Sequence, residues 1–229
     1  MKSKKVIIFI VEGISDKESL NGILSEFYEQ SEFVFVVING DITTDYGCKV
    51  DNISSKIVSY IKDAMKKKNK FYKKDIKRVV HIVDMDGAYI PDNNIVFDDC
   101  DKIMYTTNNI KTKDVEKVKD RNMRKRNIIN KLSSMNYIYG KIPYTMFYMS
   151  CNLEHVLHNL QNVSDEKKFK LASEIEDKYI DNPEEFVEFL KNSEFAVKGS
   201  LAETWKYIKK DLNSLQRHSN LRIFFEEEN

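Results

Sequence analysis

The chain alternates between short, unbroken apolar runs and longer amphipathic segments. Residues 5–11, 33–38 and 78–83 are apolar runs of strand length, and runs of this kind are typical of strands buried on both faces. Between them, residues 15–30 and 53–68 show the spacing of apolar positions that predicts amphipathic helices. Strand and helix in alternation predict an α/β fold, in which crossover helices flank a parallel, Rossmann-like sheet.

The pattern changes in the second half of the chain. Apolar spacing there predicts a strand at 102–106, a long basic helix at 113–135 and a last strand at 144–149. Beyond these, only helices are predicted, at 153–160, 164–179, 183–190 and 201–215, and the tail 222–225 fits either a final strand or a docking peptide. We therefore expect an α/β domain over residues 1–150 and a helical C-terminal subdomain over 151–229.

Composition narrows the class of protein. Seven Gly and three Pro in 229 residues are few, which argues against turn-dense all-β folds and favours long helices. The three cysteines are odd in number and far apart, so no disulfide framework is expected. The chain has no apolar run long enough to span a membrane, and the apolar stretch near its start is too short for a signal peptide. We expect a cytoplasmic protein with no membrane partner.

Charge is balanced overall but unevenly distributed. The net charge is +1, yet residues 62–78 hold nine Lys or Arg against two Asp, and residues 111–131 hold nine against three acids. Residues 165–194 instead hold ten acids against five bases. Two basic stretches of this kind are typical of a face that binds phosphate backbones, although solvated helix faces would give the same pattern.

Acidic residues follow two of the predicted buried strands. Glu12 comes directly after the first strand, and Asp84 and Asp86 come directly after the third. Because ligands bind at the carboxyl ends of parallel strands, we expect the three carboxylates to converge in one pocket. Like charges held close together are unfavourable at neutral pH, and a divalent cation removes that cost. A set of oxygen ligands without His or Cys suits Mg²⁺ or Mn²⁺. The alternative to a metal site is that these acids serve as unrelated helix caps and ion-pair partners.

These residues carry a family resemblance. The segment Phe9-Ile10-Val11-Glu12-Gly13-Ile14-Ser15-Asp16, followed by His81-Ile82-Val83-Asp84-Met85-Asp86-Gly87, resembles the TOPRIM domain of type IA topoisomerases, primases and OLD-family nucleases. The resemblance covers roughly residues 5–110. It implies Mg²⁺ ligands at Asp84 and Asp86 and a catalytic Glu12, which would be a ligand or a general acid or base. Asp16, in the first helical turn, is a further candidate ligand.

A second likeness lies at residues 147–158. This segment is similar to the strand-to-helix junction of small RloB-like TOPRIM proteins of bacterial defence loci, with Asn152 in place of the common aromatic residue. By that likeness Glu154 is a candidate ligand for a second metal ion. The chain has nothing resembling the strand-passage domains of topoisomerases or the zinc modules of primases, and this absence favours a nuclease.

The resemblance implies a Mg²⁺- or Mn²⁺-dependent nuclease that cleaves RNA, such as tRNA, or DNA, and that is a toxic effector in antiviral defence. The long basic helix would then bind the phosphate backbone. Its candidate residues are Lys117, Lys119, Arg121, Arg124, Lys125 and Arg126.

Two rival functions remain open at this stage. A phosphoryl-transfer domain of the receiver or dehalogenase type also uses acids at strand ends, but its acidic motif would follow the first strand rather than the third. The non-enzymatic alternative is a metal-binding regulatory or assembly subunit whose helical part docks a partner ATPase. Homo-oligomer formation is compatible with either reading.

Overall fold

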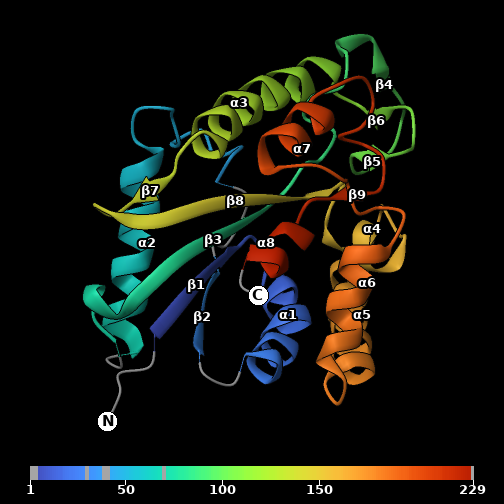
Figure 1. The fold of residues 1–229 in the computed structure, drawn as a ribbon. Helices are drawn as coiled ribbons and strands as arrows, with labels where there is room; N and C mark the ends of the chain where they lie inside the picture. The colour runs from blue at the N-terminus through green and yellow to red at the C-terminus, as the bar shows by residue number, and fades with distance from the viewer. Residues whose placement is uncertain (1–4, 29–30, 38–41, 69–70, 228–229) are drawn as a thin grey trace.

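A mixed sheet between two layers of helices forms the centre of the α/β fold (Figure 1). The computed structural model describes residues 5–28, 31–37, 42–68 and 71–227. Its main sheet has six strands in the order β2-β1-β3-β8-β7, and β9 pairs with β8. The strands are β1 (Lys5–Val11), β2 (Ser31–Val37), β3 (Ile76–Asp84), β7 (Tyr137–Ile138), β8 (Ile142–Ser150) and β9 (His218–Ser219).

The sheet is parallel at its centre and antiparallel at its margin. β1 pairs in parallel with β2 and β3, and β3 pairs in parallel with β8. β7 and β9 each pair antiparallel with β8, so the sheet is mixed. The sequence pattern predicts a wholly parallel sheet, and this part of the prediction is wrong. The antiparallel strands have two residues each, which is too short for an alternation of polar and apolar positions to be recognised.

Helices cover both faces of the sheet (Figure 1). They are α1 (Ile14–Phe27), α2 (Ile53–Lys68), α3 (Val115–Ser133), α4 (Leu153–His158), α5 (Asp165–Tyr179), α6 (Pro183–Asn192), α7 (Leu201–Ile208) and α8 (Arg222–Glu227). Two short 3₁₀ helices, η1 (Lys73–Asp75) and η2 (Asp92–Asn94), and a small sheet complete the described elements. The small sheet has the order β4-β6-β5, formed by β4 (Ile95–Phe97), β5 (Met104–Tyr105) and β6 (Ile110–Thr112).

The alternation of side chains along β1 builds two cores. Ile8 and Ile10 face one side of the sheet, where α2, α3 and α7 pack. Ile7 and Phe9 face the other side, where α1, α4, α5, α6 and α8 pack. Successive side chains of a strand point to opposite faces, so an unbroken apolar run is what a sheet covered on both faces requires.

The segment after residue 150 contributes to both cores. Trp205 of α7 lies in the core beside α2 and α3, and its Nε1 donates a hydrogen bond to Met146 O at 3.2 Å. The helix predicted over 201–215 ends at Ile208, and Ser214 O beyond it accepts a hydrogen bond from Gly87 N at 3.0 Å. The chain there leaves the helix and binds the loop after β3. The domain boundary near Ser150 stays a prediction.

The tail of the chain is an internal element of the fold. Residues 222–225 lie in helix α8, and neither a strand nor a free docking peptide forms there. Phe224 and Phe225 are fully buried, and the Phe224 ring meets the Phe9 and Phe147 rings edge-on at 5.3 and 6.4 Å between centroids. Among the described residues, no helix combines the length and the apolar character that crossing a membrane requires.

Replacing Phe224 tests whether the tail holds the sheet together. We expect Phe224→Ala to lower the free energy of unfolding by about 3–5 kcal/mol, because it opens a cavity between α8 and the sheet. Phe97→Ala is the matched control, since Phe97 is 71% exposed and its loss should change stability by less than about 0.5 kcal/mol. Urea unfolding of both variants measures the difference, and equal midpoints would contradict the placement of the tail in the core.

Candidate functional site

A cavity of about 440 Å³ opens at the carboxyl ends of the central strands. Three acids line it, Glu12, Asp84 and Asp86, and they stand at the ends of β1 and β3 as the sequence predicts. The other walls come from β5, the loop before α5 and α5 itself, which contribute Tyr105, Asn162 and Lys168. The two predicted strand ends therefore do meet in one pocket.

Asp16 belongs to the turn that leads from β1 into α1. The helix begins at Ile14, and the Asp16 Oδ2 accepts a hydrogen bond from Gly13 N at 2.8 Å. Ser15-Asp16-Lys17-Glu18 has the sequence of a capping box in which Glu18 would reach back to Ser15, but the helix begins earlier, so Gly13 is the N-cap and Asp16 reaches back to it. Only 8% of Asp16 is exposed, and this burial raises its pKa even though hydrogen bonding to Gly13 acts in the opposite direction.

Asp84 lies at the centre of the acidic cluster. Its Oδ1 accepts a hydrogen bond from Leu153 N at 3.1 Å, which ties the end of β3 to the start of α4. Burial raises the pKa of Asp84 well above its usual range, and repulsion by other carboxylates raises it further. Those carboxylates are Glu12, Asp16, Asp86 and Glu154. All five candidate metal ligands are therefore close enough to interact electrostatically.

Helix α3 holds the turn that carries Asp86. Lys125 of α3 is fully buried, and its Nζ lies 2.6 Å from Asp86 Oδ2. Arg121, one turn earlier, donates from Nη2 to Asp86 O at 3.0 Å and from Nη1 to the Tyr105 hydroxyl at 2.8 Å. Asp86 has a positive φ of 48°, and these contacts stabilise that uncommon backbone conformation.

Glu154 approaches the cluster from the first turn of α4. It is 2% exposed, and burial raises its pKa although Lys168 nearby acts in the opposite direction. The Lys168 Nζ of α5 lies 3.7 Å from Glu154 Oε1. Burial disfavours the Lys168 charge, but attraction by Glu154, Asp84 and Asp16 outweighs it and raises the pKa of Lys168. Lys168 is therefore a cation at the wall of the cavity.

The chemistry of the donors fits a hard divalent cation. The cluster offers carboxylate oxygens alone, which is the ligand type that Mg²⁺ and Mn²⁺ prefer. Within the described ranges, however, no three or more His, Cys, Asp or Glu side chains are already arranged as a metal site. The ammonium groups of Lys125 and Lys168 approach Asp86 and Glu154 instead. Binding of a metal ion would require the carboxylate side chains to move from these positions.

The six cationic candidates of α3 are not equivalent. Arg121 and Lys125 point inward and hold the Asp86 turn. Arg126 donates to Ala88 O at 3.2 Å, and Arg124 donates to Thr44 O and stacks on the Tyr46 ring. Lys119 pairs with Glu116 at 2.7 Å, and Lys117 is exposed. Periodicity alone marks a helix as amphipathic but does not show which of its cations are used within the fold.

The loop after Asp86 is closed to a ligand at Gly87. This residue has a φ of +65°, and a Cβ placed on it would lie 2.6 Å from Leu215 Cδ2 and 2.9 Å from Ile110 Cδ1. A glycine directly after Asp-x-Asp would, from the sequence alone, be expected to let backbone or phosphate approach closely. In the structure, two apolar side chains of the protein occupy that space.

Sequence reasoning missed the residues that close the cavity from the side. Asn162 accepts from Tyr105 N at 2.8 Å and donates to Tyr105 O at 2.7 Å, which joins β5 to the loop before α5. Lys168 was missed because it lies in the most acidic stretch of the chain and no local motif marks it. Its apolar neighbours at helical spacing, Leu171 and Ile175, show which face of α5 is buried and are the signal that could have identified it.

Comparisons with protein-family models, with curated proteins and with solved structures found no match for this chain.

Replacing Asp84 tests the electrostatic strain of the cluster. Because the folded state raises the pKa of this carboxyl, the folded protein binds its proton more tightly than the unfolded chain does. Its contribution to stability therefore falls as the pH rises from the ordinary pKa through the folded value. We expect Asp84→Asn, which keeps the acceptor for Leu153 N, to unfold at higher urea than the wild type at pH 8 in EDTA. The difference should shrink near pH 4, and a less stable variant at pH 8 would contradict the account.

Replacing Lys125 tests whether α3 serves the site from inside. We expect Lys125→Met to lower the free energy of unfolding by about 3–5 kcal/mol, since it leaves the Asp86 carboxylate without its buried partner. The double variant Lys125→Met/Asp86→Asn should regain part of the loss. Lys117→Met is the control, because Lys117 is exposed and should tolerate the change. Equal stability of Lys125→Met and Lys117→Met would show that the buried pair is not needed.

Proposed function

We propose that this protein is a divalent-metal-dependent nuclease with a TOPRIM-like catalytic domain. The observation that carries the proposal is that Glu12, Asp84 and Asp86 line one cavity, with Asp16 and Glu154 close enough to interact electrostatically with Asp84. The cavity lies at the carboxyl ends of parallel strands, where α/β proteins bind their ligands. The five carboxylates outnumber the two lysines, Lys125 and Lys168, that approach them. This excess of negative charge supports a role in binding cations.

Asp84, Asp86 and Glu12 would hold the metal ion, and Asp16 or Glu154 would complete the site. Bound Mg²⁺ or Mn²⁺ would supply a Lewis acid that neutralises charge on a scissile phosphate. The part of Lys125 is to fix Asp86: its ammonium group engages Oδ2, so a cation would bind through the other oxygen or displace the ammonium group. Arg121 holds the backbone carbonyl of Asp86, and the backbone N–H of Leu153 holds the carboxylate of Asp84.

Glu12 would act either as a metal ligand or in proton transfer. It directly follows β1 and lines the cavity together with the residues at the end of the neighbouring strand β3. Lys168 at the wall would hold a phosphate group by its positive charge and would offset the negative charge that develops during hydrolysis. We also propose a role in antiviral defence, with nucleic acid as the substrate, and this part rests on the likeness of residues 147–158 to RloB-like proteins.

A cleavage assay tests the proposal. Labelled tRNA, single-stranded DNA and plasmid are incubated with the purified protein in Mg²⁺, Mn²⁺ or EDTA. We expect cleavage only with metal, and we expect Glu12→Gln to reduce its rate by on the order of 100-fold or more. Glu26→Gln is the matched control, because Glu26 is an exposed acid of α1 and its replacement should leave the rate unchanged.

Two results would count against the nuclease. Equal cleavage by Glu12→Gln and wild type would show that the cavity is not the active site. Absence of cleavage on every substrate, with metal binding intact, would favour the regulatory alternative, in which the chain acts only with a partner such as an ATPase.

A further inference from the structure

A second surface, remote from the acidic cavity, combines lysines with exposed tyrosines. Two adjoining hollows of about 450 and 430 Å³ lie between α2 and the β7–β8 turn, and both are lined by Lys62 and Tyr139. Tyr137 lines the first hollow, and Tyr72 and Lys66 line the second. We call this the Tyr139 surface, which comprises Lys62, Lys66, Tyr72, Lys73, Tyr137 and Tyr139.

The aromatic side chains of the Tyr139 surface are open to solvent. Tyr72 is 70% exposed and Tyr137 is 59% exposed. The Tyr139 ring lies beneath two ammonium groups, with Lys73 Nζ at 4.3 Å and Lys62 Nζ at 5.5 Å from its centroid. Positive φ angles at Tyr139 (50°) and Gly140 (92°) form the tight turn that presents this ring. Exposed aromatic rings grouped beside cations on one surface make it a candidate binding site.

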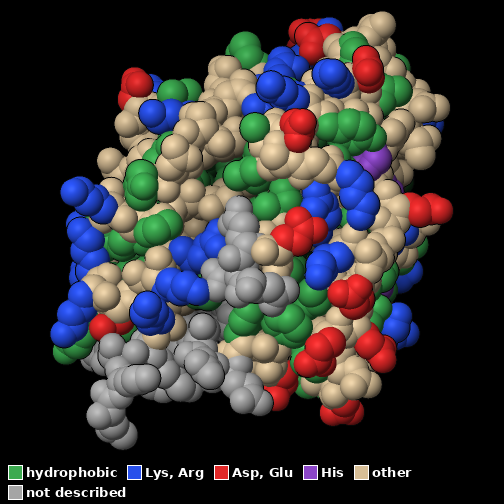
Figure 2. Space-filling model, in the orientation of Figure 1, with side chains coloured by type: hydrophobic (Ala, Val, Ile, Leu, Met, Phe, Trp, Pro, Cys, Tyr) green, Lys and Arg blue, Asp and Glu red, His purple; other side chains and the backbone are tan. Residues whose placement is uncertain are grey.

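The lysines of this surface are less neutralised by acids than those at the small sheet. Neither Lys62 nor Lys73 forms an ion pair with a carboxylate among the described residues, and Lys66 has only a loose contact with Asp63 at 3.9 Å. By contrast, Lys111 pairs with Asp98 at 3.0 Å, and Lys113 pairs with two aspartates. Figure 2 shows Lys and Arg side chains gathered along the left edge, where Figure 1 places α2 and the beginning of β3.

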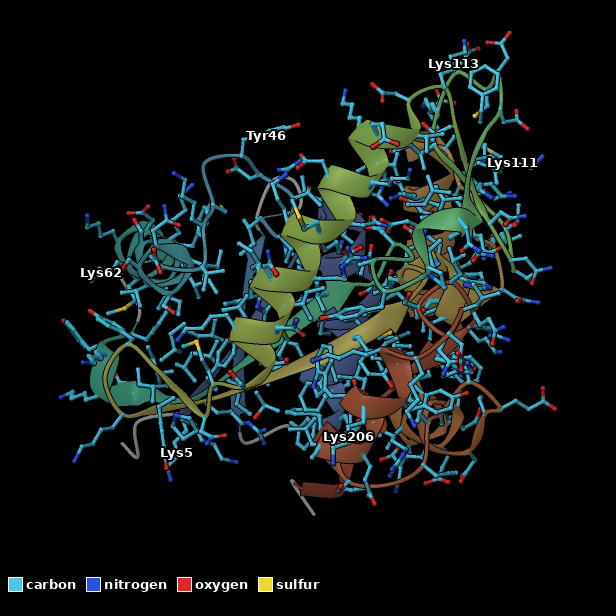
Figure 3. All side chains as sticks on the ribbon, turned by 90° about the horizontal axis from the view of Figure 1, so that it is seen from above. Lys5, Tyr46, Lys62, Lys111, Lys113 and Lys206 are labelled. Carbon is cyan, nitrogen blue, oxygen red and sulfur yellow. The ribbon has the colours of Figure 1, made fainter. Side chains whose placement is uncertain are left out.

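The Tyr139 surface and the acidic cavity lie at opposite ends of the sheet. Tyr72 and Lys73 lie at the start of η1, which leads directly into β3, whereas Asp84 ends that nine-residue strand. A strand of this length spans roughly 25–30 Å. Figure 3 shows Lys62 at one end of the molecule and Lys111 and Lys113 at the other. A ligand at the Tyr139 surface therefore does not contact the cavity directly.

We propose that the Tyr139 surface binds a single-stranded segment of nucleic acid. Unpaired bases would stack on Tyr72 and Tyr137, and the lysines would bind the phosphates. Three serine side chains of α2, Ser54, Ser55 and Ser59, line the first hollow and add hydrogen-bonding groups for phosphate or sugar. Exposed rings favour single strands over duplex, since the faces of paired bases are covered by their neighbours. The proposal takes its partner from the proposed function but needs no cleavage.

Binding without metal tests this proposal separately from the nuclease. Fluorescence anisotropy in EDTA measures the affinity of the protein for labelled oligo(dT), oligo(U) and a DNA duplex of equal length. We expect both single strands to bind more tightly than the duplex. Tyr72→Ala and Tyr137→Ala should each weaken single-strand binding about fivefold or more. The double variant Lys62→Gln/Lys73→Gln should weaken the salt dependence: the slope of log affinity against log salt concentration should become less negative by about 1.4.

The control variants match these changes elsewhere on the molecule. Phe97→Ala removes an equally exposed ring from β4, and Lys170→Gln neutralises an exposed lysine of the acidic helix α5. Both should bind like the wild type. Absent single-strand binding, unchanged affinity in the tyrosine variants, or duplex binding as tight as single-strand binding would overturn the proposal. Preference for oligo(dT) or oligo(U) identifies which nucleic acid the surface takes.

Discussion

Five carboxylates gathered at one end of a sheet cannot all carry charge without cations near them. The fold meets this constraint by bringing two lysines from helices far apart in the sequence. Lys125 comes from α3, on one side of the sheet, and Lys168 comes from α5, on the other. The need to compensate Asp86 and Glu154 connects the central strands to both helical layers.

This constraint also decides which basic residues can meet a polyanion. Along α3, Arg121 and Lys125 are committed to the Asp86 turn, and Lys119 has an acidic neighbour. The count of charges in this helix therefore overstates the positive charge that it presents to solvent. Lys62 and Lys73 form no ion pair with a carboxylate within the described ranges, and both lie over the ring of Tyr139. Catalytic chemistry and strand binding would then be located at opposite ends of the same sheet.

Much of the fold could be predicted because burial on both faces leaves a plain pattern. The apolar run of residues 5–11 predicts the strand β1, and because Glu12 follows it directly, this acid is predicted at the carboxyl edge of the sheet. The short strand β9 and helix α8 could not be predicted, because their conformations are imposed by packing against β8 and Phe9. Within the site, Lys168 escaped prediction for the same reason: its role depends on a neighbour that is distant in sequence.

The central claim is that the acidic cavity binds a metal ion. Its most direct test is a titration of the purified protein with Mn²⁺ at neutral pH, in which electron paramagnetic resonance measures the free ion. The account predicts saturable binding in the wild type that is weakened by Asp84→Asn and unaffected by replacement of the exposed Glu26. Absence of saturable binding up to millimolar Mn²⁺, or equal binding by Asp84→Asn, would contradict a metal site in the acidic cavity.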